Sequence, residues 1–145
     1  MNDLSDLKVP GPTITQLTAP FWDAAEAGRL HLQHCEACQR AVFYPRRICP
    51  HCWSDRLVWR EASGRGHLKS FSIVHRPGHP GWAPAAPYVV GLVELAEGPT
   101  MLSLVLDEAP SVGMALRLRP TRVGDRRLPA FEAAPTTDSP TGDTP

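Results

Sequence analysis

The four cysteines of the chain are the residues whose type and spacing most directly imply chemistry. Cys35 and Cys38 form one Cys-x-x-Cys pair, and Cys49 and Cys52 form a second pair ten residues further on. A Cys-x-x-Cys turn directs two thiolates at one ion, and two such turns complete the tetrahedral sulfur sphere of a structural zinc site. The spacing therefore predicts one Zn2+ bound by all four cysteines, which leaves no thiol to act as a nucleophile.

Other uses of these cysteines are less well supported by the pattern. Iron fits the same ligands, so the sequence alone does not separate zinc from iron, although nothing indicates electron transfer. Disulfides need an oxidising compartment that the sequence does not imply. The segment Cys49-Pro50-His51-Cys52 alone resembles a redox motif. That motif belongs at the start of a helix in a βαβ unit, whereas here a second cysteine pair lies at zinc-ribbon spacing.

Two arginines just before the second cysteine pair form the other cluster that could bind a ligand. Arg46 and Arg47 follow Pro45, and they either balance the thiolate charge or contact an anion, since the guanidinium fork suits phosphate. No histidine or carboxylate is tied by a motif to a nucleophile, so we expect no catalytic residues.

We expect Trp82 and Tyr88 to pack or to shield an apolar ligand.

Composition and charge limit the classes of partner. The 145 residues carry 15 basic and 15 acidic side chains, for a formal net charge of +0. Without the basic excess that accompanies nucleic-acid binding, we rank nucleic acid as an unfavoured partner. The N-terminus lacks the basic flank and apolar run of a secretory signal, and no stretch approaches the roughly 20 apolar residues of a membrane span. We therefore expect no membrane association and a cytoplasmic location.

The elements that must hold these residues divide the chain into four parts. We expect an extended arm over 1–17, a helix and zinc ribbon over 18–62, an OB-fold over 63–132 and a disordered tail over 133–145. The helix should begin near Thr18 as N-cap, with Pro20 in its first turn, and end at Gly28. The cysteine pairs alternate with short strands, which is the pattern of a rubredoxin-like zinc ribbon.

The second half of the chain is predicted to be entirely β-structure. Five short strands without helical periodicity indicate a small barrel; we place them near 67–75, 88–95, 100–106, 114–119 and 128–132. The second and third strands are apolar on nearly both faces, so we expect the arm, the ribbon or a partner chain to cover one outer face. Residues 76–87 form a proline-rich excursion longer than a hairpin requires, and loops of that length are often functional. The fold class is thus mainly β.

Several of these segments together resemble a known family, the zinc-ribbon/OB-fold proteins catalogued as domain of unknown function 35 (DUF35). The resemblance covers about residues 18–132 and rests on these segments: Phe21-Trp22-Asp23-Ala24-Ala25, Gly28-Arg29-Leu30, Gln33, the two cysteine pairs, Pro45-Arg46, Trp59, Ser63-Gly64-x-Gly66, Pro87-Tyr88-Val89-Val90-Gly91 and Val93-Glu94-Leu95. Members of this family accompany acyl-CoA enzymes, either as small subunits of thiolases, acyltransferases and aldolases or as domains fused to acyl-CoA hydratases.

The resemblance implies a non-catalytic accessory subunit that binds acyl-CoA at a site shared with a thiolase-like partner making or breaking a carbon–carbon bond. Arg46 and Arg47 would then meet the CoA phosphates, and His79 and Trp82 in the 76–87 loop would lie over the pantetheine or acyl end. Two alternatives remain from other classes. One is a single-stranded nucleic-acid binder on the same ribbon and barrel, which the neutral charge disfavours. The other is an independent acyl-CoA hydrolase or decarboxylase, for which no motif is present.

Overall fold

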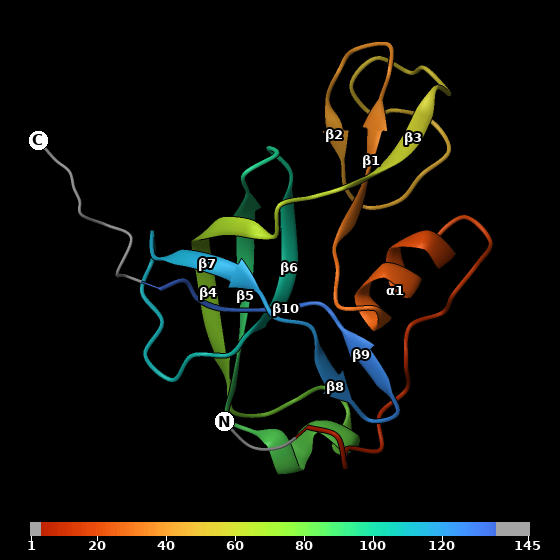
Figure 1. Ribbon diagram of the computed structural model, residues 1–145. Helices are drawn as coiled ribbons and strands as arrows, with labels where there is room; N and C mark the ends of the chain where they lie inside the picture. The colour runs from red at the N-terminus through yellow and green to blue at the C-terminus, as the bar shows by residue number, and fades with distance from the viewer. Residues whose placement is uncertain (1–3, 136–145) are drawn as a thin grey trace, which may run out of the picture.

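The chain folds into a small ribbon sheet above a closed β-barrel, with one α-helix between them (Figure 1). The computed structural model describes residues 4–135. The strands are β1 (His31–Cys35), β2 (Ala41–Val42), β3 (Leu57–Glu61), β4 (Arg65–Val74), β5 (Tyr88–Leu95), β6 (Thr100–Val105), β7 (Ala115–Leu118), β8 (Thr121–Val123), β9 (Arg126–Leu128) and β10 (Ala130–Ala133). The mainly β class is therefore confirmed. Within the described residues, no helix has the length and apolar character needed to cross a membrane.

Helix α1 (Ala19–Glu26) occupies the predicted place and ends in the predicted way. Phe21, Ala24 and Ala25 are buried because residues three and four apart share one helix face. The N–H of Gly28 donates to the carbonyl of Ala25 and that of Arg29 to the carbonyl of Ala24, with Gly28 at φ +88°. This is a Schellman motif, in which glycine adopts the left-handed conformation without steric cost.

The start of the helix differs from the prediction in one detail. Thr18 is the N-cap residue, but its side chain makes no capping hydrogen bond to the helix. Its hydroxyl instead accepts a hydrogen bond from the backbone N–H of Thr15, 3.0 Å away. The threonine therefore stabilises the turn that leads into the helix, and Pro20 in the first turn removes one N–H that would otherwise need a partner.

The first sheet has the strand order β2-β1-β3, and Cys35 is the last residue of β1. Strand β1 pairs antiparallel with both neighbours, so that Gln33 lies opposite Val42 on one side and Trp59 on the other. Strand β2 has only two residues. The buried Gln33 side chain extends the pairing, because its Nε2 donates to the carbonyl of Arg46 at 2.9 Å and its Oε1 accepts from the Arg46 N–H at 2.8 Å.

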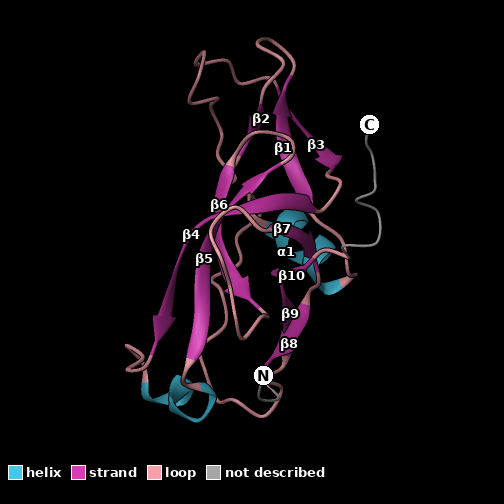
Figure 2. Cartoon of the chain, turned by 90° about the vertical axis from the view of Figure 1, so that its left-hand side faces the viewer, coloured by secondary structure: helices cyan, strands magenta, loops and turns pink. Residues whose placement is uncertain are grey.

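The barrel closes in the order β10-β6-β5-β4-β7, which is the predicted five-stranded OB-fold. Alternate residues of each strand point inward and meet in one core. Its most buried members are Leu68, Val93, Val105, Leu116 and Phe131, each at most 1% exposed. The long strands β4 and β5 pair antiparallel along their whole length (Figure 2). The barrel thus presents one broad outer face, formed by β4, β5 and β6.

Two segments differ from the sequence prediction in the second half of the chain. Residues 120–127 were left without structure between two predicted strands, but residues 121–128 form the hairpin β8–β9, whose turn contains Gly124 at φ +64°. The last barrel strand, β10, runs to Ala133, one residue into the range predicted as a tail. Positions 136–145 of that predicted tail lie outside the described residues.

The N-terminal arm lies against the lower end of the barrel. Leu4 and Leu7 are buried in a second apolar cluster whose other buried members are Ala85, Tyr88 and Val123. The carbonyl of Leu4 accepts a hydrogen bond from the Gly124 N–H at 3.0 Å. Nearby, residues Pro80–Ala85 of the proline-rich excursion form a short 3-10 helix, η1, below β4 and β5 (Figure 2). The arm, η1 and the hairpin therefore cover the lower part of the barrel together.

Candidate functional site

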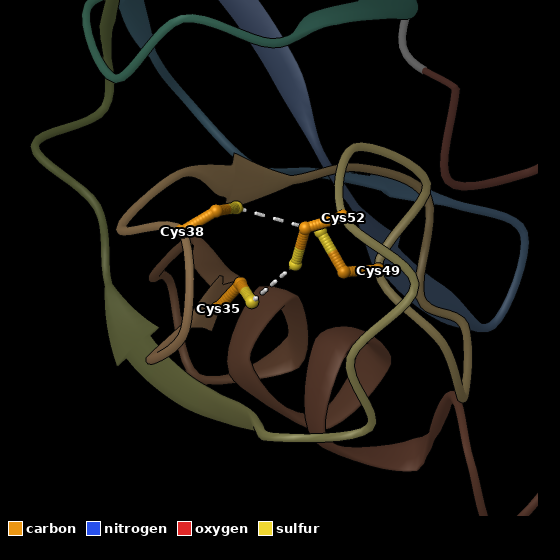
Figure 3. Close-up of side chains that lie close together, drawn as sticks. All are labelled: Cys35, Cys38, Cys49 and Cys52. Carbon is orange, nitrogen blue, oxygen red and sulfur yellow. Dashed lines mark hydrogen bonds between the residues drawn. The ribbon is translucent and has the colours of Figure 1, made fainter.

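The four cysteines, two from each of two turns, converge on one point, as predicted (Figure 3). Their sulfur atoms all lie within 4.8 Å of one another, with Cys35 Sγ 3.6 Å from Cys52 Sγ and Cys38 Sγ 3.7 Å from Cys49 Sγ. Four sulfurs at the zinc–sulfur distance of ~2.3 Å would be about 3.8 Å apart at the edges of a tetrahedron. The four cysteines are thus positioned to bind one zinc ion.

The two cysteine turns have the same backbone conformation. Gln39 and Trp53, each the residue after the second cysteine of its pair, have φ values of +65° and +69°. In each turn the N–H of that residue donates to the carbonyl of the first cysteine, Cys35 or Cys49, at 2.8 and 2.9 Å. The repeated geometry directs both thiol pairs at one point. It requires a left-handed backbone conformation at Gln39 and Trp53, which non-glycine residues seldom adopt.

Backbone amides prepare one of the thiols to bind as a thiolate. The N–H of Cys38 points at Cys35 Sγ and lowers the pKa of the Cys35 thiol to about 7. Burial has the opposite effect on Cys38 and raises its pKa to about 12. A bound zinc ion supplies the positive charge that deprotonates a coordinating thiol outright, so both act as ligands.

Below the ribbon, an apolar groove of about 570 Å³ opens on the outer face of the barrel. Its lining comes from α1, the segment after β2, η1, β5, β6, β9 and the residue that joins β9 to β10. The lining residues are Phe21, Trp22, Phe43, Tyr44, Trp82, Tyr88, Val90, Met101, Leu102, Ser103, Leu104, Leu128 and Pro129. A concave apolar site with few polar groups is the usual form of a small-molecule site.

Aromatic side chains form the upper wall of this groove. Phe21 contacts Trp22, Phe43 and Tyr44 at ring-centroid distances of 4.8, 5.5 and 5.8 Å. The indole Nε1 of Trp22 donates a hydrogen bond to the Tyr44 hydroxyl at 3.2 Å. These aromatic contacts, two of them edge-to-face, and the hydrogen bond join the helix to the ribbon and hold the wall in one shape.

The lower wall comes from η1 and the start of β5. Trp82 packs on Tyr88, with ring centroids 5.0 Å apart and planes tilted by 39°. The rim toward solvent is apolar as well, since Leu102 is 64% exposed and lies opposite the exposed Leu92 of β5. The arm does cover part of the outer face, as anticipated, but it leaves this rim open.

The residues suggested for CoA binding occupy three different settings. Trp82 lies in the groove, and Arg46 is next to it, since its Nε donates to the carbonyl of Tyr44 at 3.1 Å. Arg47 is exposed on the same turn. His79 caps η1, where its Nδ1 accepts from the Gly81 N–H at 2.9 Å, and it does not line the groove.

Sequence reasoning missed most of the groove. The sequence placed Phe21 and Trp22 in the predicted helix without a binding role, and nothing in it singled out Phe43 or Tyr44. The signal that could have identified them is the number of aromatic residues in so small a ribbon, which exceeds what its core can bury. The approach of these residues to Trp82 and Tyr88 depends on the packing of α1 against the barrel.

Comparison with known proteins identifies the family. Residues 22–58 match the rubredoxin-like zinc ribbon domain of ChsH2, and residues 59–120 match the C-terminal OB-fold domain of ChsH2. A solved chain titled Ltp2-ChsH2(DUF35) aldolase aligns with a TM-score of 0.75 and 35% identity, covering 86% of this chain and all of that one. The chain belongs to the DUF35 family.

Two curated relatives of this DUF35 protein are larger subunits. It is 38% identical over 112 residues, 75% of the chain, to a probable enoyl-CoA hydratase alpha subunit of Thermomonospora curvata. It is 32% identical over 137 residues, 90% of the chain, to the 3-oxo-4,17-pregnadiene-20-carboxyl-CoA hydratase alpha subunit of Mycobacterium tuberculosis. The DUF35 chain spans 34% and 42% of the lengths of these relatives.

Proposed function

We propose that this chain is a non-catalytic accessory subunit of an acyl-CoA-processing enzyme, and that its partner is a member of the thiolase superfamily. In this assembly, the partner makes or breaks a carbon–carbon bond, and the present chain contributes acyl-CoA binding and water exclusion at a shared site. The observation that carries the proposal is the apolar groove, which occurs in a chain 35% identical to the whole DUF35 chain of an aldolase.

The chemistry of the described residues supports the accessory role. All four cysteines belong to the zinc site, so no thiol is available as a nucleophile. Among residues 4–135, the hydrogen bonds of histidine rings are those of His34 to Gln39 and of His79 to Gly81, and neither joins a histidine to a carboxylate. Thioester chemistry needs an activated nucleophile or a paired base and an oxyanion site, and the partner would have to supply them.

The groove and its rim support the acyl-CoA part of the proposal. An apolar acyl chain placed between Trp82 and the aromatic upper wall would exclude water from a large apolar surface. Arg46 and Arg47 lie beside the groove on a turn that Gln33 holds in place. We propose that they meet the CoA phosphates, with His79 near the pantetheine arm, because guanidinium groups bind phosphate in a bidentate manner.

The decisive experiment mixes the subunits. We expect the purified chain alone to turn over no acyl-CoA, and coexpression with a thiolase-superfamily protein of the same genome to yield a complex that forms or cleaves a carbon–carbon bond. The double variant Arg46→Ala/Arg47→Ala should raise the acyl-CoA KM of the complex with less change in kcat, because a remote phosphate contact acts on binding.

The matched control is Arg56→Ala/Arg60→Ala, which removes two exposed arginines of the ribbon that do not line the groove. This variant should leave KM unchanged. Turnover by the chain alone would refute the accessory role. An equal rise in KM for both double variants would show that general charge, and not a phosphate contact at Arg46 and Arg47, governs binding.

A further inference from the structure

The hydroxyl of Tyr88 is a polar group in an apolar site without a protein partner. The residue is only 9% exposed and belongs to the apolar cluster that contains Leu4 and Leu7. No described residue forms a hydrogen bond with its hydroxyl, whereas the other tyrosine of the chain, Tyr44, accepts a hydrogen bond from Trp22. A phenol in an apolar site normally has a hydrogen-bond partner, so this hydroxyl is available to water or to a ligand.

Tyr88 lines the groove, and its hydroxyl is not fully enclosed by protein. In the described part of the chain, the fully buried side-chain nitrogen and oxygen atoms without a partner are two nitrogens of Arg126, and the Tyr88 oxygen is not among them. The hydroxyl therefore reaches accessible space, and the groove is the cavity that Tyr88 lines. Ser103, another polar residue of the lining, donates its hydroxyl proton to backbone carbonyls of Leu104 and Pro129 at 3.2 Å.

The chemistry of a phenol limits what can pair with it. Burial raises the pKa of Tyr88 above its ordinary value, so the hydroxyl keeps its proton at neutral pH and is a hydrogen-bond donor. The matching group is an acceptor that an apolar site tolerates, and an uncharged carbonyl oxygen meets this requirement whereas a carboxylate or phosphate does not.

We propose that the Tyr88 hydroxyl donates a hydrogen bond to a carbonyl oxygen carried by an otherwise apolar ligand in the groove. This inference rests on the proposed placement of an acyl group in the groove. It adds that the part of the acyl group in contact with Trp82 bears a carbonyl. Tyr88 would thus select ligands with a carbonyl at the lower end of the groove, because a hydrocarbon of the same shape leaves the phenol unpaired.

Binding of a fluorescent ketone to the full chain tests this directly. The probe is 6-propionyl-2-dimethylaminonaphthalene, whose emission moves to longer wavelength when its carbonyl accepts a hydrogen bond, and the comparison ligand is the 6-propyl analogue without the carbonyl. We expect the bound ketone to emit at longer wavelength than in an alkane. In Tyr88→Phe the emission should shift back, and the ketone affinity should fall roughly three- to tenfold, with the analogue's affinity unchanged.

Two controls separate the hydrogen bond from general damage to the groove. Ser72→Ala removes an exposed hydroxyl of β4 that does not line the groove, and it should keep the long-wavelength emission. The thermal midpoint and zinc content of Tyr88→Phe should match those of the unaltered chain, since the ring and its contact with Trp82 remain. The emission of the ketone bound to the unaltered chain tests the hydrogen bond even if a variant does not fold.

The inference is overturned if neither compound binds, if the bound ketone emits as it does in an alkane, or if Tyr88→Phe weakens both compounds equally. None of these results bears on the subunit-mixing assay. Partner-dependent turnover together with any of them would leave the proposed function standing and refute the role of Tyr88.

Discussion

At the scale of single residues, two neighbouring arginines of β9 approach the same helix but have different hydrogen-bond partners. Arg127 donates from Nη1 to the backbone carbonyl of Glu26 at 3.2 Å, and its guanidinium lies against Gly28. Arg126 approaches Asp23 only to 3.6 Å, and its Nε and Nη2 are buried without a hydrogen-bond partner among the described residues. Burying guanidinium nitrogens without a hydrogen bond costs free energy, which the long ion pair with the exposed Asp23 offsets only in part, so the two side chains should contribute differently to stability.

Replacing each arginine by methionine tests this difference. Arg126→Met should leave the free energy of unfolding unchanged or raise it by up to about 1 kcal/mol, because the aliphatic part is kept and the guanidinium nitrogens that lack hydrogen bonds are removed. Arg127→Met should lower it by about 1–2 kcal/mol through the lost hydrogen bond and packing. Urea unfolding of both variants provides the measurement, and a larger loss for Arg126→Met than for Arg127→Met would contradict the assignment.

At the scale of elements, the ribbon depends on its metal site more than on its strands. Its buried cluster consists of Cys35, Val42 and Cys49, with Cys38 and Leu57 packed against them, so most of its core is the ligand set itself. Strand β2 contributes two residues, and the Gln33 side chain substitutes for further strand pairing. The barrel, in contrast, has a larger apolar core, to which Phe21, Leu30 and Leu32 also contribute. The two parts should therefore respond differently to loss of zinc.

We predict one tightly bound zinc per chain and local unfolding when its ligands are lost. Cys38→Ser, or a strong chelator, should remove several kcal/mol of the ~10–16 kcal/mol available to such sites. Hydrogen exchange should then show lost protection in β1, β2 and β3 with protection retained in β4, β5 and β6. A folded, reduced sample without zinc by elemental analysis, or equal loss of protection in ribbon and barrel, would be incompatible with this prediction.

At the scale of the whole molecule, α1 is fastened to the hairpin β8–β9 through one carboxylate. Glu26 accepts hydrogen bonds from the Arg127 backbone N–H at 3.0 Å and from Arg122 Nη2 at 2.9 Å. These residues are about 100 positions apart in the chain. The contact places the helix that bears Phe21 and Trp22 against the barrel, and so it sets the distance between the two walls of the groove.

This contact should make stability depend on pH in the acid range. The Arg127 N–H, with the Arg122 guanidinium, lowers the pKa of Glu26 below its ordinary value, so the folded state binds the proton less readily than the unfolded state. The stabilisation is therefore present above the unfolded pKa of about 4.3 and is lost as pH falls through the lower folded value.

Urea midpoints measured between pH 6 and pH 2.5 should fall less steeply in Glu26→Gln than in the unaltered chain. Glu132 provides a comparison, because hydrogen bonds from Arg119 and Arg117 also lower its pKa and neither arginine contacts Glu26. Glu132→Gln should remove a different share of the pH dependence, and the two effects should add because the sites share no partner. An unaltered acid slope in Glu26→Gln would show that Glu26 does not fasten the helix.

The zinc site, the helix and the five barrel strands could be predicted because each is encoded within a short segment. Two thiolates separated by two residues meet one ion whatever surrounds them, Gly28 terminates its own helix, and strand alternation is a property of consecutive residues. The groove, the fastening at Glu26 and the unpaired Tyr88 hydroxyl were decided only by the tertiary structure. They are formed by residues from Phe21 to Pro129, and side chains so distant in sequence meet only when helix, ribbon and barrel have packed together.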